Sequence, residues 1–368
     1  MKIVFNTDQV YLQGGIESVM AIKANYFVNL PDVEVYIVTT EQQDKPPYYT
    51  LDSKIKLIDL GVNYDRTKSY FTIDNLKRVF KHHKEQKKLF KKLKPDVIIS
   101  PNYNFDHYWL PFIKGRSLLV KERHGSRYFE KEDRLSGGVK NKLSYLLNDW
   151  IDSLYNYIVV LNKDEKEFVQ SSNAVVIPNP IELSAWRSSL ENKCVVAAGR
   201  ISPVKGFDDL IKSWAIVEQE YPDWQLHIYG QNYAQTQQEL ENIIDTLQLN
   251  NVVFKGSVSN MAKVMSDYSL YTMTSKTECF PMVLLEAKSV GLPIVSYDCP
   301  FGPRNIVKDQ QDGVLVEQNN VGKFAEEVIK LIADKELRLK MGQNAIENVN
   351  QFAIDKVMKM WTNLLCVK

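Results

Sequence analysis

Residues 275–287 carry the combination of side chains most suited to binding a charged ligand. They read SKTECFPMVLLEA and follow a strand-like apolar run. Pro281 suits the first turn of a helix, because its missing N–H group would have no partner there anyway. The N–H groups of Met282 and Val283 would then point out of the helix end and, with the helix dipole, form a site for an anion such as phosphate.

Two carboxylates flank this predicted anion site. Glu278 lies on the loop before the helix, and Glu286 follows Met282 by four residues, so it projects from the same face one turn later. Carboxylates accept hydrogen bonds from sugar hydroxyls, so the spacing suits a ligand that carries both a phosphate and a sugar. On spacing alone, an ordinary helix start with one surface glutamate has about equal weight.

Two cations follow another predicted strand, in the segment AAGRISPVKG. Arg200 would stand at the carboxyl edge of the sheet, where open α/β sheets bind ligands, and Lys205 lies five residues later. Arginine offers a planar fork to phosphate and lysine a mobile point charge, so together they could neutralise a diphosphate. Taken alone, the segment is explained better by two solvated loop cations.

A glycine pair, Gly14-Gly15, follows the first predicted strand in the segment QGGIE. Glycine at such a place permits close approach of the backbone to a ligand. The sequence contains neither G-x-G-x-x-G nor G-x-x-x-x-G-K-[ST], so dinucleotide and P-loop chemistry have poor support. A second pair, Gly137-Gly138, lies among polar residues and indicates a plain loop.

These candidate residues would be positioned by short strand-like runs that alternate with longer helical patterns. Several runs, such as DVIIS and YIVVL, are apolar at consecutive positions, which is typical of parallel strands covered by helices on both faces. Such alternation predicts two doubly wound α/β domains. The predicted strands are Lys2–Asn6, Val33–Thr40, Lys56–Leu60, Asp96–Ser100, Ser117–Lys121, Tyr157–Leu161, Ala174–Ile177, Lys193–Ala198, Gln225–Tyr229, Asn251–Phe254, Leu270–Thr274, Pro293–Ser296 and Gly313–Val316.

The boundary between the two domains is marked by the segment Ile-Pro-Asn-Pro-Ile at residues 177–181. Neither a helix nor a central strand tolerates two prolines so close together. We therefore expect an N-terminal domain over residues 1–178 and a C-terminal domain over 179–368. The last helix of the chain is expected to pack back on the N-terminal domain.

Net charge, cysteine spacing and the length of the apolar stretches limit the kinds of protein that this chain could be. The net charge is +1 over 368 residues, which argues against a nucleic-acid partner. Residues 1–178 hold 27 Lys and Arg against 22 Asp and Glu, so the positive charge gathers in the first half. The four cysteines form no C-x-x-C pair, and the longest apolar stretches are far shorter than the ~20 residues that span a bilayer. These features predict a cytoplasmic protein, with attachment to a membrane surface left open.

Taken together, the motifs resemble glycosyltransferase family 4, a retaining family with the GT-B fold. The resemblance covers essentially the whole chain, and its motifs occur in the expected order. They are the Gly-Gly-x-Glu turn at 14–17, the Ile-Pro-Asn hinge at 177–179, Gly199-Arg200 with Lys205-Gly206, Tyr229-Gly230, Glu278 with Glu286, and the run DGVLV at 312–316. The run SYDCPFGPR at 296–304 looks like the subgroup that makes bacterial capsule, exopolysaccharide or lipopolysaccharide. One departure is Cys279, which stands where the family usually has glycine.

The resemblance implies roles for the binding residues. Glu278 would contact hydroxyls of the donor sugar, and Glu286 would contact the ribose. Arg200 and Lys205 would hold the diphosphate of a nucleotide sugar. The backbone at Gly14, Gly15, Phe280, Pro281, Met282 and Val283 would line the phosphate site, and Tyr229, Gly230 and Ser257 would lie near the base.

The histidines divide by position. His124 ends a predicted strand at the ligand edge, and the resemblance implies that it faces the reacting sugar. His227 lies inside a strand and is interpreted as a core residue. His82 and His83 fall in a basic helix and are expected to be solvated.

That basic helix covers residues 75–94, where nine Lys and Arg accompany one Glu. Leu76, Val79, Phe80, Phe90 and Leu93 fall at roughly helical spacing, which predicts an amphipathic helix. Docking on an anionic membrane surface is one interpretation. A solvated helix that covers its sheet has near-even odds.

These observations predict a GT-B enzyme, with two Rossmann-like doubly wound domains facing a cleft. The donor would be a nucleotide sugar, with uridine as the expected base, and the acceptor a glycan or lipid-linked glycan. No Asp-x-Asp pair occurs in the sequence, so we expect no metal or other cofactor, with Arg200 and Lys205 replacing the metal's charge. A nucleotide-sugar epimerase of the same fold and a non-catalytic subunit on a membrane surface remain alternatives.

Overall fold

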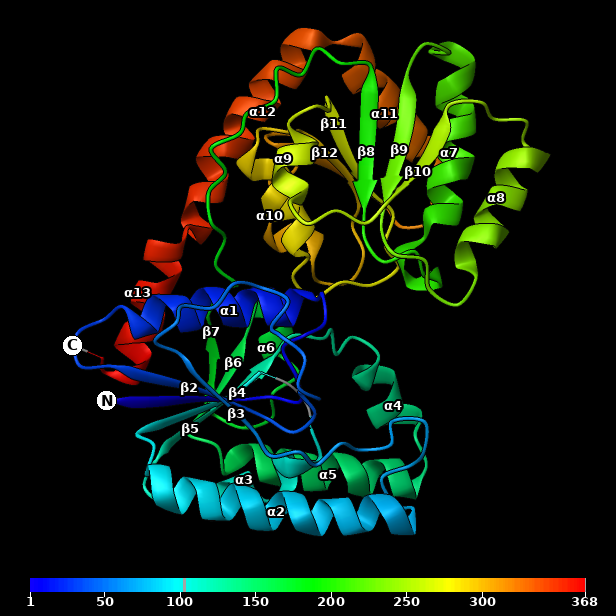
Figure 1. Ribbon diagram of the computed structural model, residues 1–368. Helices are drawn as coiled ribbons and strands as arrows, with labels where there is room; N and C mark the ends of the chain where they lie inside the picture. The colour runs from blue at the N-terminus through cyan, green and yellow to red at the C-terminus, as the bar shows by residue number, and fades with distance from the viewer. Residues whose placement is uncertain (102–103, 368) are drawn as a thin grey trace. The chain divides into compact units, whose positions relative to one another are not determined.

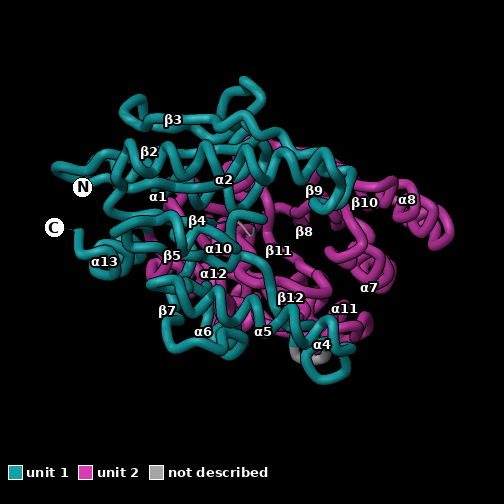
Figure 2. The backbone as a smooth tube through the Cα atoms, turned by 90° about the horizontal axis from the view of Figure 1, so that it is seen from below, with its two compact units in different colours: residues 1–180, 354–368 teal, residues 181–353 magenta. Residues whose placement is uncertain are grey.

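The computed structural model of the protein describes residues 1–101 and 104–367. The chain divides into two compact units, which are coloured separately in Figure 2. Unit 1 comprises Met1–Pro180 and Ile354–Lys368, and unit 2 comprises Ile181–Ala353. Among the described residues, no helix has the length and apolar character needed to cross a membrane.

Unit 1 is built on a sheet of seven strands in the order β3-β2-β1-β4-β5-β6-β7 (Figure 1). Every neighbouring pair runs parallel. The strands are β1 (Lys2–Asn6), β2 (Glu34–Thr39), β3 (Lys56–Asp59), β4 (Val97–Ser100), β5 (Leu118–Arg123), β6 (Tyr157–Val160) and β7 (Ala174–Val176).

Helices cover both faces of this sheet. One face packs on α1 and α13 through a core that includes Phe27 and Trp361. The other face packs on α2, α3 and α5 through Phe90, Leu110 and Ile151. The helices of unit 1 are α1 (Gly15–Val28), α2 (Ile73–Leu93), η1 (Phe105–Tyr108), α3 (Leu110–Ile113), α4 (Glu130–Ser136), α5 (Val139–Ser153), α6 (Lys163–Lys166) and α13 (Ile354–Leu365).

Unit 2 has a sheet of six parallel strands in the order β10-β9-β8-β11-β12-β13. One face packs on α7 and α11 through residues such as Trp214 and Phe324. The strands are β8 (Cys194–Ala198), β9 (Gln225–Tyr229), β10 (Val252–Gly256), β11 (Leu270–Met273), β12 (Ile294–Tyr297) and β13 (Gly313–Val316). The helices are η2 (Pro203–Lys205), α7 (Phe207–Glu220), α8 (Thr236–Thr246), α9 (Met261–Met265), α10 (Met282–Ser289), η3 (Pro303–Asn305), α11 (Val321–Ala333), α12 (Lys335–Val349) and η4 (Asn350–Phe352).

All thirteen predicted strands are present, with ends that differ by at most two residues from those expected. Two doubly wound parallel sheets are therefore confirmed. In each sheet the strand order reverses at one place, between β1 and β4 in unit 1 and between β8 and β11 in unit 2. Open α/β sheets bind ligands beyond the carboxyl ends of the strands at such a switch point, so the loops after these strands are the places to look for a site.

Helix α2 corrects one expectation, because it turns polar side chains toward the sheet. Asn75, His82 and Gln86 are all buried, on the same stripe of the helix as Phe90. His82 Nδ1 lies 3.0 Å from the Tyr64 hydroxyl, and burial lowers the pKa of the imidazole. The expectation that His82 is solvated is wrong, because the spacing of 82, 86 and 90 places all three against the sheet.

Candidate active site

The loops that follow β8 and β11 are tied together at the switch point of unit 2. Gly206 has φ +62°, and a Cβ built there would lie 2.1 Å from the Thr274 carbonyl oxygen. The Thr274 hydroxyl donates to the Gly206 carbonyl at 2.8 Å, and the N–H of Lys276 donates to the Val204 carbonyl at 2.8 Å. Glycine at 206 therefore serves both a left-handed backbone and a close approach between two loops.

This junction places Lys205 beside Glu278. Lys205 Nζ lies 2.5 Å from Glu278 Oε1, and both side chains are partly exposed. Arg200 is exposed and lies instead over the Tyr233 ring, with its guanidinium carbon 5.7 Å from the ring centroid. Two of the four charged residues predicted in this unit therefore form a direct pair, and Arg200 stands on the same loop as Lys205.

Helix α10 begins where the sequence predicted, with Pro281 as its N-cap residue and Met282 as its first helical residue. Phe280 is buried against Phe352, with ring centroids 5.5 Å apart and the rings close to perpendicular. The helix start is thereby held in place by packing while Met282 and Val283 stay partly exposed. The first N–H groups of a helix have no partner within it, so this end can receive an anion.

Glu286 lies one turn into α10 and is only partly accessible. Burial raises the pKa of its carboxyl to about 7. Near neutral pH this group therefore exists in both protonation states, unlike an ordinary surface glutamate. A partner that donates hydrogen bonds would favour the ionised form.

Two hydroxyls on the same loop were not singled out from the sequence. Ser275 Oγ and Thr277 Oγ1 are buried, and neither has a hydrogen-bond partner among the residues that the structure describes. Buried polar groups are nearly always hydrogen-bonded, so such a pair beside Glu278 calls for an explanation. The short motif SKT that precedes Glu278 is the only sequence signal that could have pointed to them.

The three residues expected near a base lie at the end of β9 and on the loops after β9 and β10. Tyr229 ends β9, and its hydroxyl lies 2.8 Å from that of Tyr268, which in turn lies 2.7 Å from Nδ1 of His227. His227 is buried in β9, as expected for a core residue. Gly230 must be glycine, because an added Cβ would lie 1.9 Å from the Gly199 carbonyl oxygen. Ser257 is exposed on the loop that follows β10.

A buried ion pair fixes the C-terminal part of α10 to the rest of unit 2. Lys288 Nζ lies 2.7 Å from Asp312 Oδ2 and 2.6 Å from the Ile306 carbonyl oxygen, and the side chains of both Lys288 and Asp312 are 0% exposed. Asp312 also accepts from the N–H of Lys308 at 2.9 Å and from Asn348 Nδ2 at 2.8 Å. The helix that carries Glu286 is thereby fixed to the loop before β13.

In unit 1 the glycine pair lies at the start of α1, after the switch-point strand β1. Gly14 is the N-cap residue and Gly15 the first helical residue. A Cβ built on Gly15 would have no atom of the described residues within 4 Å, so the packing described by the structure does not require glycine there. Glu17, one turn into the helix, accepts from Gln9 Nε2 at 2.7 Å, and burial raises the pKa of its carboxyl.

His124 follows β5 directly and is held by a buried charge pair. Its Nε2 lies 3.1 Å from Glu122 Oε2, and the same carboxylate pairs with Lys23 of α1. Burial alone would raise the pKa of Glu122, but Lys23 and His124 outweigh it and bring that pKa down to about 2. Glu122 therefore stays ionised and orients the His124 ring, a positioning role that the sequence did not suggest.

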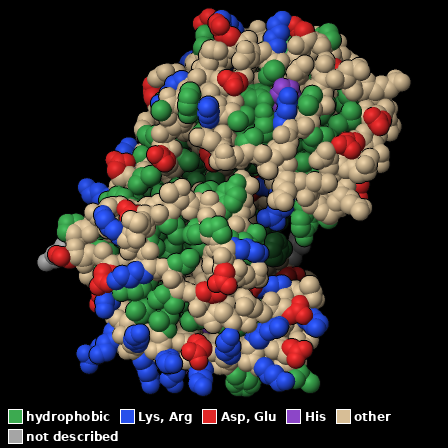
Figure 3. Space-filling view, in the orientation of Figure 1, with side chains coloured by type: hydrophobic (Ala, Val, Ile, Leu, Met, Phe, Trp, Pro, Cys, Tyr) green, Lys and Arg blue, Asp and Glu red, His purple; other side chains and the backbone are tan. Residues whose placement is uncertain are grey.

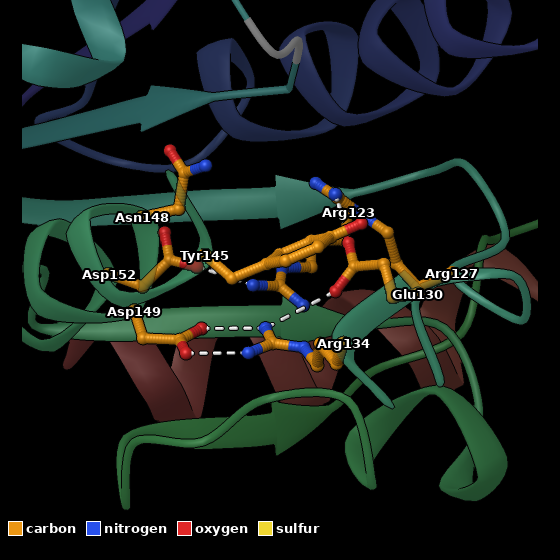
Figure 4. A pocket seen from close by; sticks show the side chains of 8 residues that line it. All are labelled: Arg123, Arg127, Glu130, Arg134, Tyr145, Asn148, Asp149 and Asp152. Carbon is orange, nitrogen blue, oxygen red and sulfur yellow. Dashed lines mark hydrogen bonds and ion pairs between the residues drawn. The ribbon is translucent and has the colours of Figure 1, made fainter. Parts of the chain in front are cut away.

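Arg123 at the end of β5 lines a small polar pocket together with side chains of α4, α5 and the loop before α4 (Figure 4). Arg134 donates to both oxygens of Asp149, at 2.7 and 2.8 Å, and Arg123 pairs with Asp152. Arg127 pairs with Glu130. Each arginine of the pocket thus pairs with a carboxylate. These ion pairs connect α4 to α5 and α5 to the sheet.

Comparison with known proteins gives this geometry a context. Residues 181–348 match the family of glycosyl transferases group 1. The chain is 28% identical over 328 residues to an uncharacterized glycosyltransferase of Haemophilus influenzae, covering 87% of this chain and 88% of that protein. It is also 28% identical over 225 residues to an amylovoran biosynthesis glycosyltransferase of Erwinia amylovora, covering 56% of this chain and 61% of that protein.

Among solved structures, the chain superposes on Anabaena HepE in complex with UDP and glucose with a TM-score of 0.77. The superposition covers 99% of both chains at 17% sequence identity. At this identity the likeness concerns the fold, and it extends over both units.

Proposed function

Because this chain is a glycosyltransferase with the GT-B fold, we propose that it transfers a sugar from a nucleotide-sugar donor, with uridine as the base, to a glycan or lipid-linked glycan. The observation that carries the proposal is the Lys205–Glu278 pair, which lies at the switch point of unit 2 beside a helix N-terminus and two hydroxyls that have no hydrogen-bond partner in the described part of the chain. A sugar diphosphate has the complementary groups, namely two negative phosphates and several hydroxyls. Similarity to proteins of polysaccharide synthesis supports a glycan acceptor.

The donor would replace the pair that unit 2 now makes within itself. Lys205 would turn from Glu278 to the diphosphate, joined by Arg200 and by the N–H groups of Met282 and Val283. Glu278 would then accept from hydroxyls of the donor sugar, and Glu286 from the ribose. In unit 1, we propose Gly15 and His124 as further ligand contacts. The space around Gly15 is open, and the ring of His124 is oriented by Glu122.

The reaction we propose retains the anomeric configuration, as in glycosyltransferase family 4. The acceptor oxygen attacks the anomeric carbon from the same face as the leaving diphosphate. The bond between that carbon and the phosphate oxygen breaks, and a non-bridging phosphate oxygen takes the acceptor's proton. The protein contributes orientation and fixed positive charge, which stabilise the charge that develops on the diphosphate.

We propose that this charge stabilisation needs no metal ion. The test is a screen of nucleotide sugars for release of free nucleotide, with and without excess chelator. We expect uridine-linked sugars to be hydrolysed slowly without acceptor, at the same rate in chelator, because Arg200 and Lys205 are covalently fixed cations. Loss of turnover in chelator with recovery in magnesium or manganese would refute metal independence. Conversion of the donor to an epimer without release of nucleotide would refute glycosyl transfer.

The raised pKa of Glu286 predicts a pH-dependent affinity for nucleotide. An ionised carboxylate accepts hydrogen bonds from ribose hydroxyls, so affinity for UDP should rise as pH increases through about 7. In the free protein the same shift has the opposite effect on stability, because the folded state binds more protons than the unfolded state between pH about 4.5 and about 7, and stability falls as pH rises there.

The measurement is calorimetric titration with UDP at several pH values. UDP itself titrates near pH about 6, so the informative quantity is the difference between the wild type and Glu286→Gln. Glu286→Gln should bind UDP more weakly at high pH and lose the extra pH dependence. Glu278→Gln should keep UDP affinity and reduce kcat instead, and equal loss of UDP affinity in both variants would mean that the two roles are wrongly assigned.

For the setting of the reaction, we propose the cytoplasmic side of a bacterial membrane and the synthesis of capsule, exopolysaccharide or lipopolysaccharide. The run SYDCPFGPR at 296–304 supports this class of product. The basic helix over residues 75–94 supports attachment to an anionic membrane surface, where a lipid-linked acceptor is found. No role for nucleic acid is proposed.

A further inference from the structure

Helix α5 of unit 1 exposes most of its large apolar residues and turns two carboxylates inward. Its apolar residues Val139, Leu143, Leu146, Leu147 and Trp150 are between 48% and 77% exposed. They recur every three or four residues and therefore form one stripe along the helix. Large apolar side chains gathered on one exposed stripe mark a surface that contacts something other than water.

The inner face of the same helix carries, beside the buried Ile151, carboxylates that are fixed by ion pairs. Asp149 makes two hydrogen bonds with Arg134 of α4, and Asp152 is buried between Lys121 and Arg123 of β5 (Figure 4). Rotating α5 to bury its leucines would expose these pairs and break them. The outward direction of the apolar stripe is therefore set by the structure of unit 1.

Neighbouring elements extend the apolar surface. Phe112 of α3 is 62% exposed, and its ring centroid lies 6.1 Å from that of Trp150. Trp109, next to α3, donates to Gln86 of α2 at 2.7 Å, so α2, α3 and α5 follow one another across the same face of the sheet. Both Figure 1 and Figure 2 show α2 and α5 on this one side of the sheet.

Helix α2 adds positive charge to this face. Its exposed lysines recur at helical spacing on the side away from the sheet, and Figure 3 shows basic side chains gathered along that edge of unit 1. Among the helix's own apolar residues, Phe90 is buried in the core, whereas Ile73 and Phe80 are each 74% exposed, so α2 offers fewer apolar side chains to lipid than α5 does. The exposed lysines of α2 are Lys77, Lys81, Lys84, Lys87, Lys88, Lys91 and Lys92, and the exposed Lys94 follows directly after the helix.

We propose that the apolar stripe of α5, with Phe112, inserts into the interfacial region of an anionic membrane while the lysines of α2 contact the lipid headgroups. Anionic lipid is the occupant that matches both properties, since it offers negative charge beside an apolar layer. The proposal deepens the membrane attachment proposed above, because it names the inserting element and makes α2 an electrostatic partner. It does not depend on glycosyl transfer, and its test uses no substrate.

The test is co-sedimentation of the full-length protein with vesicles of phosphatidylcholine, with or without phosphatidylglycerol, at low and high salt. The stripe variant is Leu143→Gln/Leu146→Gln/Trp150→Gln, and the lysine variant is Lys84→Gln/Lys88→Gln/Lys91→Gln. A matched control changes exposed apolar residues of unit 2, Ile216→Gln/Leu247→Gln. Far-UV circular dichroism and thermal unfolding check that each variant is folded.

We expect the wild type and the control to bind anionic vesicles, and the stripe variant to bind them at least tenfold more weakly at both salt concentrations. The lysine variant should lose at least tenfold at low salt and less at high salt, where surface charges are screened. Binding of a folded stripe variant at the wild-type level would overturn the proposal. So would a wild type that ignores both kinds of vesicle, or one that forms a dimer that the stripe variant dissociates.

Discussion

Replacing Lys205 by alanine should lower kcat/KM for the nucleotide-sugar donor by at least about 100-fold, which corresponds to about 2.7 kcal/mol of transition-state stabilisation. Its ammonium group is fixed at the sheet switch point, 2.5 Å from Glu278, where a leaving diphosphate would gain negative charge. Arg200→Ala should cause a loss of similar size, because its guanidinium is exposed on the same loop. Initial rates over a range of donor concentrations give the ratio.

The matched control for both variants is Lys212→Ala. Lys212 is an exposed lysine of α7 that makes surface ion pairs with Asp208 and Asp209, so its loss should leave the rate nearly unchanged. Thermal unfolding should also be similar for the three variants, since none of these side chains is in a core. Near-normal rates for both Lys205→Ala and Arg200→Ala would remove the cation pair from the mechanism.

Replacing Lys288 by methionine should lower the free energy of unfolding by about 3–5 kcal/mol. The substitution leaves the Asp312 carboxylate buried without its counter-charge, and breaking a buried pair from one side has a cost of about this size. Denaturation by urea, followed by the fluorescence of buried Trp214 and Trp224 in unit 2, measures the effect.

Two further variants separate charge from packing. Lys288→Met/Asp312→Asn should recover part of the loss, because the neutral amide oxygen can still accept from the N–H of Lys308. Lys193→Met breaks an exposed pair with Asp223 and should cost less than about 1 kcal/mol. A loss in Lys288→Met no greater than in Lys193→Met would show that the buried pair contributes little.

The strands and the start of α10 could be predicted from the sequence because their signals are local. Runs such as KIVFN are apolar at consecutive positions, and Pro281 marks a helix start wherever the rest of the chain lies. Lys205 and Glu278 were assigned to one ligand only through the family resemblance, and the fold gives the physical reason, since loops after adjacent parallel strands meet at one edge of a sheet. The unpartnered hydroxyls of Ser275 and Thr277 could not be foreseen, because their burial depends on how the loop is folded.

The helices were less predictable, because which face of a helix is buried depends on distant partners. The stripe of α5 has the spacing of a core-facing helix, yet Asp149 and Asp152 are turned inward by arginines and a lysine from other elements. In α2, His82 is buried and Phe80 is 74% exposed, the reverse of what polarity alone suggests. In both helices buried ion pairs or hydrogen bonds compensate for polar groups placed against the sheet.

The helix α13 has a consequence for how the chain is made. Val357, Met358, Trp361 and Leu365 belong to the core of unit 1, although more than 170 residues of unit 2 separate them from the rest of that core. On a translating ribosome, unit 2 is complete in sequence as soon as residue 353 has emerged, whereas unit 1 still lacks part of its interior. The unit whose synthesis begins first is therefore the last to be completed. Until α13 is made, apolar residues on the α1 face of its sheet remain uncovered, and chaperones of nascent chains can recognise such a surface.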